Sequence, residues 1–288
     1  MSQTDGVQLK AESSKRRMWR RFRSNRTAVA GSLVLLVLIL VAVFADAISP
    51  TQYDTVSRNR LTAPSLAYPL GTDDLGKDVL SGVIYGSRIS LVIGFSSAFL
   101  ATLIGVTLGL ISGFYGGRID DLLMRFTEAV LIIPRFFLVL MVIAVVGTNT
   151  MLLIAIIGLT SWPSSARLLR AEILSLRELE FVESARAMGS SNARIMVRHL
   201  LPNALHPVVV NGTLGIASAI LLEAGLSFLG LGDPSVVSWG QMLQNAQQYF
   251  TRAWWMSVFP GAAIFVTVLA FNLVGDGLND VLNPKITD

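Results

Sequence analysis

The segment 71–77 has the spacing of a phosphate-binding loop. It fits the pattern G-x-x-x-x-G-K, in which backbone amides hold phosphate groups and the lysine pairs with them. Asp78 stands where the pattern needs a Ser or Thr hydroxyl for Mg²⁺, and two aspartates inside the segment would repel phosphate. No buried strand is expected before it. We therefore reject a nucleotide site here, and ATP chemistry would have to come from another chain.

Four ionisable residues fall within or near long apolar stretches: Glu128, Arg135, Glu223 and Asp276. Burying a charge at membrane depth is costly, so such residues are functional candidates. Glu128 and Arg135 are seven apart, which predicts one helical face but no direct pair. We expect Arg135 to line a pathway, contact another helix, snorkel or pair with a partner subunit. We expect Glu223 and Asp276 to hold helix ends or a subunit interface, near opposite membrane faces.

The chain offers little for enzymatic or metal chemistry. It has no cysteine, which excludes disulfides and thiolate metal sites. Its two histidines, His199 and His206, both lie outside the predicted spans. A membrane-embedded enzyme would need a nucleophile–base pair or a metal cluster within the spans. We predict no catalytic residues, no metal ligands and no cofactor in this chain.

The composition places these residues in a membrane protein. Hydrophobic residues make up 52% of the chain and charged residues 15%, against about 25% charged in soluble domains. Five stretches contain no Asp, Glu, Lys or Arg: 28–45, 89–117, 136–166, 207–222 and 253–275. A helix crosses the hydrocarbon core with about 20 apolar residues. Membrane-spanning helices therefore explain these stretches better than the buried helices of a soluble core.

Six spans are predicted, and the chain is expected to be all-α. They lie at about 28–48, 89–113, 126–147, 150–170, 207–226 and 254–276. The turn residues 147–150 divide one long apolar run into two helices, so the third span begins before Glu128 and includes Arg135. Pro134, Pro163 and Pro260 mark expected kinks or helix ends. The first apolar segment is too long for a cleavable signal peptide and is expected to remain.

The basic residues predict the orientation. With the N-terminus inside, 17 of the 23 Lys and Arg residues fall on the cytoplasmic side, five fall outside, and Arg135 lies in a span. Basic residues accumulate on the cytoplasmic side, so both termini are predicted to be cytoplasmic. The basic cluster at 15–23 is then a topology signal and a lipid-headgroup anchor rather than a nucleic-acid site.

Four parts follow from this topology. Residues 1–27 form a basic cytoplasmic arm, 28–48 the first span and 49–88 an extracytoplasmic segment. Residues 89–288 form a core of five spans with a cytoplasmic loop at 172–206.

The second span carries small residues at every fourth position: Ala101, Gly105, Gly109, Gly113 and Gly117. Small residues allow helix backbones to approach closely in lipid. This ladder predicts a helix-packing face.

The loop between the fourth and fifth spans predicts two short polar helices. The first ends at Gly189, which can adopt the left-handed C-cap conformation. Ser190, Ser191 or Asn192 can cap the second helix, and Pro202 is expected to close it. A polar helix pair held between two membrane spans suits the docking of a cytosolic partner. An ordinary solvated loop is the simpler alternative, while a DNA-binding helix-turn-helix is disfavoured by the membrane tether at both ends.

This loop resembles the E-A-A-x3-G-x9-I-x-L-P signature of ABC importer permeases, which forms a coupling helix that inserts into the ATPase subunit. Glu183, Ala185, Gly189, Leu201 and Pro202 match the signature. Ser184 replaces its second residue, and His199 stands where an apolar Ile is usual. The resemblance implies that the residues of this docking segment contact the ATPase: Glu183, Ser184, Ala185, Arg186, Gly189, Leu201 and Pro202.

Three further blocks narrow the resemblance to the dipeptide/oligopeptide/nickel family. Residues 70–81 are similar to its L-G-T-D-x-x-G-R-D-x-x-S segment, with Lys77 at the usual Arg position. Residues 223–232, followed by Trp239 and Gly240, and residues 272–284 are similar to two more blocks. Together with the basic arm they resemble the C-type member of a two-permease heterodimer, in which Arg135 takes the place of a smaller or apolar residue.

The resemblance implies the six-span fold of a type I ABC importer permease in the bacterial cytoplasmic membrane. It also implies three kinds of protein partner besides membrane lipid: a second related permease, two ATPase subunits or domains that bind ATP and Mg²⁺, and an extracytoplasmic substrate-binding protein. No nucleic acid is expected. Di- or oligopeptides are the expected cargo, with a nickel- or glutathione-type import permease as an alternative. An ion-coupled secondary transporter is the other alternative, although it would need no docking loop.

Overall fold

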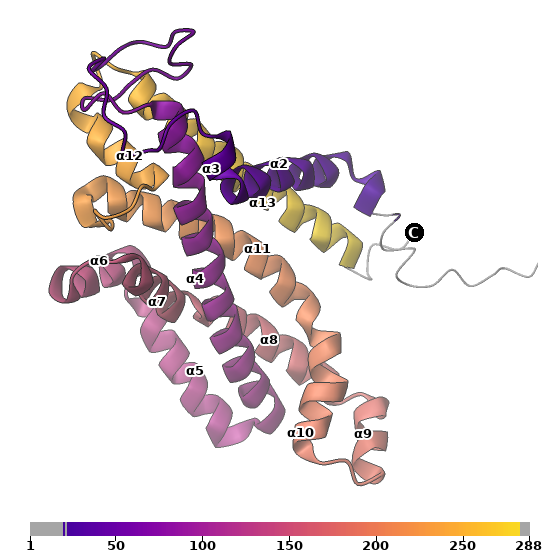
Figure 1. The fold of residues 1–288 in the computed structure, drawn as a ribbon. Coiled ribbons are helices and arrows are strands. Elements are labelled where there is room, and N and C mark those ends of the chain that lie inside the picture. Colours follow the sequence, from indigo (N-terminus) through magenta and orange to yellow (C-terminus); the bar gives the residue numbers. More distant parts are fainter. Residues whose placement is uncertain (1–19, 21, 283–288) are drawn as a thin grey trace, which may run out of the picture.

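The computed structural model describes residue 20 and residues 22–282, and this part of the chain is helical, without a β-strand. An isolated bridge joins Thr72 and Asp78. The α-helices are α2 (Arg26–Val43), α3 (Ala45–Ile48), α4 (Val79–Tyr115), α5 (Gly117–Ile132), α6 (Arg135–Val146), α7 (Thr150–Ser161), α8 (Pro163–Leu176), α9 (Glu180–Ala187), α10 (Asn192–Arg194), α11 (Leu201–Leu226), α12 (Trp239–Ala246) and α13 (Trp255–Leu282) (Figure 1).

Within the described residues, five helical segments are long and apolar enough to cross a membrane. They are α2, α4, α7 with α8, the continuous segment Asn192–Leu231 that contains α10 and α11, and α13. The helices α5 and α6 make a sixth crossing only if they count as one span, because they meet at an angle of 80°. The prediction of several membrane helices is confirmed. The third predicted span, 126–147, is a broken helix.

The break between α5 and α6 has a local cause. Ile133 precedes Pro134 and has extended backbone angles (φ −82°, ψ 122°). The proline ring disfavours the helical conformation for the residue before it, so α5 ends there and α6 starts in a new direction. Glu128 and Arg135 therefore lie on two different helices. Our placement of both on one helical face was wrong, because it assumed an unbroken helix.

The ladder of small residues packs α4 against α8. A Cβ on Gly109 would lie 2.5 Å from the carbonyl oxygen of Ala166, and one on Gly113 would lie 2.8 Å from the Cβ of Ile173. The two helices therefore approach too closely for larger side chains, as the ladder predicts. The ladder ends at Gly113. Gly117 is not part of it, because α4 stops at Tyr115 and Gly117 begins α5 with open space around it.

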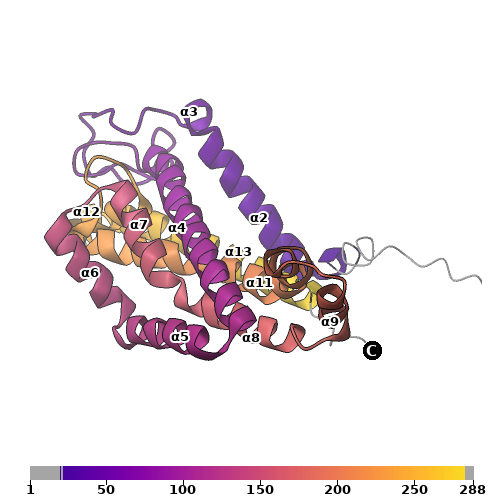
Figure 2. The same cartoon turned by 90° about the horizontal axis from the view of Figure 1, so that it is seen from below.

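The first membrane helix lies alongside the last. In both views α2 runs next to α13 (Figures 1 and 2). A Cβ on Gly31 would be 2.9 Å from the carbonyl oxygen of Ala270, so this contact is also tight. At the start of α2 the side chain of Asn25 accepts from the amide of Ala28 and donates to Asp280 (3.0 Å). The cap of one helix thus fixes the end of the other.

Two groups of non-spanning segments lie at opposite ends of the molecule. Residues 49–78 and α12 gather at one end, and α9 and α10 lie at the other, with α4 running between the two ends (Figure 1). The indole of Trp239 donates to the Val83 carbonyl (2.9 Å), and that of Trp255 donates to the Thr72 carbonyl (3.0 Å). These bonds fasten α12 and the segment 49–78 to the membrane helices.

Candidate functional site

The short helix α9 ends at the predicted glycine. The amide of Gly189 donates to the Arg186 carbonyl (2.9 Å) and the amide of Ser190 donates to the Ala185 carbonyl (3.0 Å), the two bonds of a Schellman motif. Gly189 has φ +77°, and a Cβ there would meet nothing within 4 Å. Glycine is therefore favoured here by its backbone conformation rather than by a lack of space.

The second short helix begins at Ser191, whose side chain accepts from the amide of Arg194. Our expectation that Pro202 closes this helix was wrong, because the helical segment continues from Asn192 to Leu231. A π-helical turn, Ile195–Leu200, precedes the proline, and the amide of Leu201 donates to Met196, five residues earlier. Pro202 lies at the first turn of α11, where a missing amide costs little.

This helix pair, residues 180–200, has one face packed on the membrane helices and one face free. Val182, Ala185, Ile195 and Leu200 are at most 1% exposed and join a cluster with residues of α4, α8 and α11. The outer face carries most of the predicted docking residues. Glu183, Ser184, Arg186, Gly189 and Pro202 are exposed, Leu201 is half-buried, and Ala185 is buried. The segment 180–202 is therefore anchored on one side and accessible on the other.

A polar cluster beside this region was not predicted from the sequence. Arg170 on α8 donates two hydrogen bonds to the carboxylate of Asp120 on α5, both at 2.5 Å, and Ser112 on α4 also donates to Asp120. Arg177 donates to the Gly113 carbonyl at the end of α4 (3.0 Å). These contacts hold α4, α5 and α8 together. The sequence around Asp120 does not indicate this contact, because its partner Arg170 lies 50 residues away.

A polar cavity of about 110 Å³ lies at the middle of three long helical segments. Ser97 is the central residue of α4, Ser164 is next to the centre of Thr150–Leu176, and Asn211 is at the centre of Asn192–Leu231. Arg135, the first residue of α6, also lines the cavity. Polar residues from four segments thus meet near the middle of the long membrane helices.

The other ionisable candidates lie elsewhere. Glu128 on α5 is exposed, as is Asp276 on α13. Glu223, near the end of α11, is 1% exposed, and its carboxylate accepts from Ser227 and from Ser238, each at 2.7 Å. Because Ser238 caps α12, Glu223 links two helices. The structure brings Arg135 alone, of these four candidates, to the cavity.

Two family models match the chain. Residues 105–288 match the binding-protein-dependent transport system inner membrane component, and residues 13–67 match the N-terminal TM domain of oligopeptide transport permease C. The chain belongs to the binding-protein-dependent ABC permease family. It is a multi-pass inner-membrane subunit of an ATP-driven importer, and separate ATPase subunits hydrolyse the ATP. Permeases of this family work with ATPase subunits and a substrate-binding protein.

Similar proteins include permeases with different named cargoes. A dipeptide transport system permease protein, DppC, of Alkalihalophilus pseudofirmus is 40% identical, with 97% of this chain and 92% of the relative covered. A glutathione transport system permease protein, GsiD, of Pectobacterium atrosepticum is 41% identical, with 94% and 91% covered. The solved inward-facing MetNI methionine ABC transporter has a chain of the same fold, at 20% identity and a TM-score of 0.54, covering 70% of this chain and 96% of that one.

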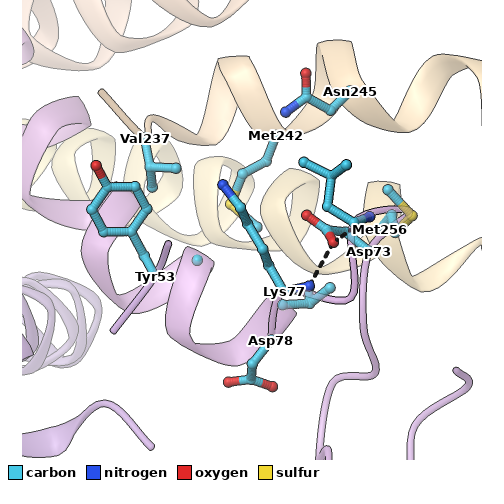
Figure 3. A pocket seen from close by; sticks show the side chains of 11 residues that line it. Tyr53, Asp73, Lys77, Asp78, Val237, Met242, Asn245 and Met256 are labelled. Atoms are coloured by element: carbon cyan, nitrogen blue, oxygen red, sulfur yellow. Dashed lines mark hydrogen bonds between the residues drawn. The ribbon is translucent and has the colours of Figure 1, made fainter. Parts of the chain in front are cut away.

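At the end opposite α9, the permease has a second, smaller cavity of about 70 Å³ between residues 53–82 and α12 (Figure 3). Asp73 accepts from the amides of Leu75 (2.9 Å) and Lys77 (2.7 Å), and Lys77 reaches over the ring of Tyr53. Burial raises the pKa of Asp73, against the effect of these two amides. The amides that a phosphate would need are therefore already occupied by a carboxylate, which agrees with rejecting a nucleotide site.

Asp233 holds the start of α7 at the same end of the permease. Its carboxylate accepts from the amide (2.8 Å) and the hydroxyl (2.7 Å) of Thr150, and from the hydroxyl of Ser235 (2.6 Å). Partial burial favours the neutral acid, but the hydrogen bonds from Ser235 and Thr150 outweigh it and lower the pKa of Asp233 to about 2. Asp233 thus connects the segment after α11 to α7.

Proposed function

We propose that this permease imports peptide-like solutes and couples that import to ATP through the docking segment 180–202. It would form one half of the translocation pathway, with a second homologous permease as the other half. Two ATPase subunits or domains would bind ATP and Mg²⁺ and contact the docking segment. An extracytoplasmic binding protein would deliver the solute.

One observation carries the coupling role: the docking segment is exposed on its outer face and continuous with a membrane helix. Its exposed residues Glu183, Ser184 and Arg186 offer charges and a hydroxyl to a partner. Its inner face is buried against α4, α8 and α11. A partner that moves this segment would therefore move those helices with it, because packed interiors deform little.

The mechanism follows from this connection. Closure of the ATPase pair around ATP moves the two docking segments, one from each permease. The membrane helices then rock, so that the pathway opens to the outside, receives solute from the binding protein and closes again. This orientation requires α9 and α10 to lie in the cytoplasm and residues 49–78 outside, as the distribution of basic residues favours.

The cargo class is proposed from relatives whose names specify dipeptide and glutathione transport. Both are small solutes that carry a peptide or peptide-like bond and free carboxylates. The binding protein would choose among such solutes, and the permease would accept what it delivers.

The experiment compares docking variants of the full importer in proteoliposomes. Glu183→Arg reverses an exposed charge, and Gly189→Trp adds bulk where no neighbour is within 4 Å. We expect each to lower ATP-driven peptide uptake at least about 10-fold. Glu183→Arg would place like charges opposite each other at the interface, and Gly189→Trp would hold the ATPase surface away from the docking segment. Co-purification of the ATPase subunits reports whether docking itself is lost.

Conservative variants at the same positions serve as controls. Glu183→Gln keeps the shape of the side chain without reversing its charge, and Gly189→Asn introduces a small side chain that tolerates positive φ. Both should retain most of the uptake. Normal ATP-driven uptake and ATPase association by Glu183→Arg and Gly189→Trp would reject the docking role. Uptake driven by a proton gradient without ATPase subunits would support a secondary transporter instead.

A further inference from the structure

We propose that the mid-membrane cavity binds the carboxylate of the transported solute through Arg135. This inference rests on the proposed function and adds a chemical requirement to it. The solute must present a free carboxylate when it passes the centre of the membrane.

The cavity carries a positive charge without a balancing acid. Besides Arg135, its lining includes five serines, one threonine and one amide, Asn211, and none of its lining residues is Asp or Glu. In the part of the chain that the structure describes, no carboxylate lies within ion-pair distance of Arg135. A charge at this depth is costly unless an anion or water compensates it.

The guanidinium of Arg135 can donate more hydrogen bonds than it makes among the described residues. Within this part of the chain it makes one hydrogen bond, from Nη1 to the hydroxyl of Ser161 (3.3 Å), whose own proton goes to the Ile157 carbonyl. A guanidinium has five N–H donors in a planar fork, so enough remain to bind a carboxylate with two parallel bonds. Asn211, which donates to Ser165 (3.1 Å), adds a second polar group to the lining of the cavity.

The cavity also has an opening and room for a ligand group. Ser164 and Ser218 line it and are exposed, so it is reachable from one side. Its volume of about 110 Å³ holds several water-sized groups, which suits the end of a peptide rather than a whole one. The serine and threonine hydroxyls can accept or donate, and so can bind the neighbouring peptide group without selecting side chains.

The test uses the assembled importer in nanodiscs, without the binding protein. Equilibrium dialysis measures the binding of trialanine and of trialanine amide, which differ in the C-terminal charge. We expect the wild type to bind the acid about 10-fold more tightly than the amide, as one charged hydrogen-bonded contact typically provides. Arg135→Gln should lose this preference. Arg125→Gln, which removes an exposed arginine from α5 outside the cavity, should keep it.

Three outcomes would overturn the inference: equal binding of both peptides by the wild type, no binding of either, or an unchanged preference in Arg135→Gln. Loss of the second permease from the purified Arg135→Gln complex would overturn it as well, since Arg135 would then serve the subunit interface. Failure of the proposed function is separate. It would appear as an intact wild-type importer that takes up no peptide with ATP and binding protein present.

Discussion

Asp233 illustrates how one carboxylate can secure the start of a membrane helix. It receives four hydrogen bonds, from the amide and the hydroxyl of both Thr150 and Ser235, and its pKa is lowered to about 2 from an ordinary value of 3.8. A carboxyl whose pKa is lower in the folded state adds stability above its unfolded pKa. That stability is lost as the pH falls toward the folded pKa. The relevant window is therefore about pH 4 to 2.

We predict that Asp233→Asn lowers the stability of the permease above pH 4 by about 1 kcal/mol. This figure is below the full pKa shift because water screens a partly exposed group. The difference between the wild type and the variant should shrink below pH 4. Thermal unfolding of both proteins at several pH values measures it. A difference that stays constant down to pH 2 would contradict the assignment, and Thr150→Val should reduce the pH dependence by removing one donor.

At the residue scale, local features are predictable and long-range partners are not. The cap at Gly189 and the start at Ser191 depend on a few neighbouring residues, so the sequence predicts both. Arg135 is recognisable as an unusual charge, but its contact with Ser161 is 26 residues away and depends on the bend at Pro134. The cavity could have been suspected from Asn211, a strongly polar residue within an uncharged run.

The contact between α4 and α8 depends on glycine at three successive positions of the ladder. At Gly109 a Cβ would lie 2.5 Å from a backbone oxygen, which cannot move without shifting α8.

We predict that Gly109→Ala destabilises the permease by about 1–3 kcal/mol, the usual cost of overpacking. The matched control is Gly261→Ala in α13, where a Cβ meets nothing within 4 Å. This control should be neutral, or more stable by up to about 1 kcal/mol, because alanine is the better helix former. Thermal unfolding in nanodiscs compares the two. Equal effects would show that the ladder does not set the distance between the helices.

At the element scale, two prolines show that a sequence pattern predicts some helix ends correctly and others wrongly. Each of Pro134 and Pro202 suggests a helix end. At Pro134 the chain does bend, because Ile133 adopts an extended conformation. At Pro202 the helix continues, because the preceding π-helical turn changes the hydrogen bonding there to a five-residue spacing and the proline follows it at the start of α11. Sequence gives the same signal for both, and the difference lies in the neighbouring backbone.

The two ends of the molecule are predicted to face opposite sides of the membrane. The chain has no cysteine, so a single introduced cysteine reports its own accessibility without background from this subunit. Ala67 in the segment 49–78 and Ala193 in α10 are both exposed.

We predict that a membrane-impermeant maleimide labels Ala67→Cys in intact cells and labels Ala193→Cys only after the membrane is opened. The reverse pattern would place α9 and α10 outside and would exclude ATPase docking there. Labelling of both in intact cells would show that the membrane had been breached, and the measurement would be repeated with a cytoplasmic marker as control.

At the scale of the whole molecule, the sequence predicts the rough position of the apolar segments, since composition alone determines it. It does not predict how four of these segments meet. The cavity is lined by Arg135 and by residues that lie within 97–102, 161–165 and 211–219. Their meeting depends on the close approach of α4 to α8 and on the bend before α6. Both are properties of packing rather than of any single stretch.

The helical segment Asn192–Leu231 connects α10 to the opposite end of the molecule. Its 40 residues span roughly 60 Å at 1.5 Å per residue, with the docking segment at one end, Glu223 near the other and Asn211 at the centre. A tilt of about 5° around the centre would displace each end by about 3 Å in opposite directions while leaving the centre nearly in place. A solute held beside Asn211 would therefore stay in place, while its access changes from one side of the membrane to the other.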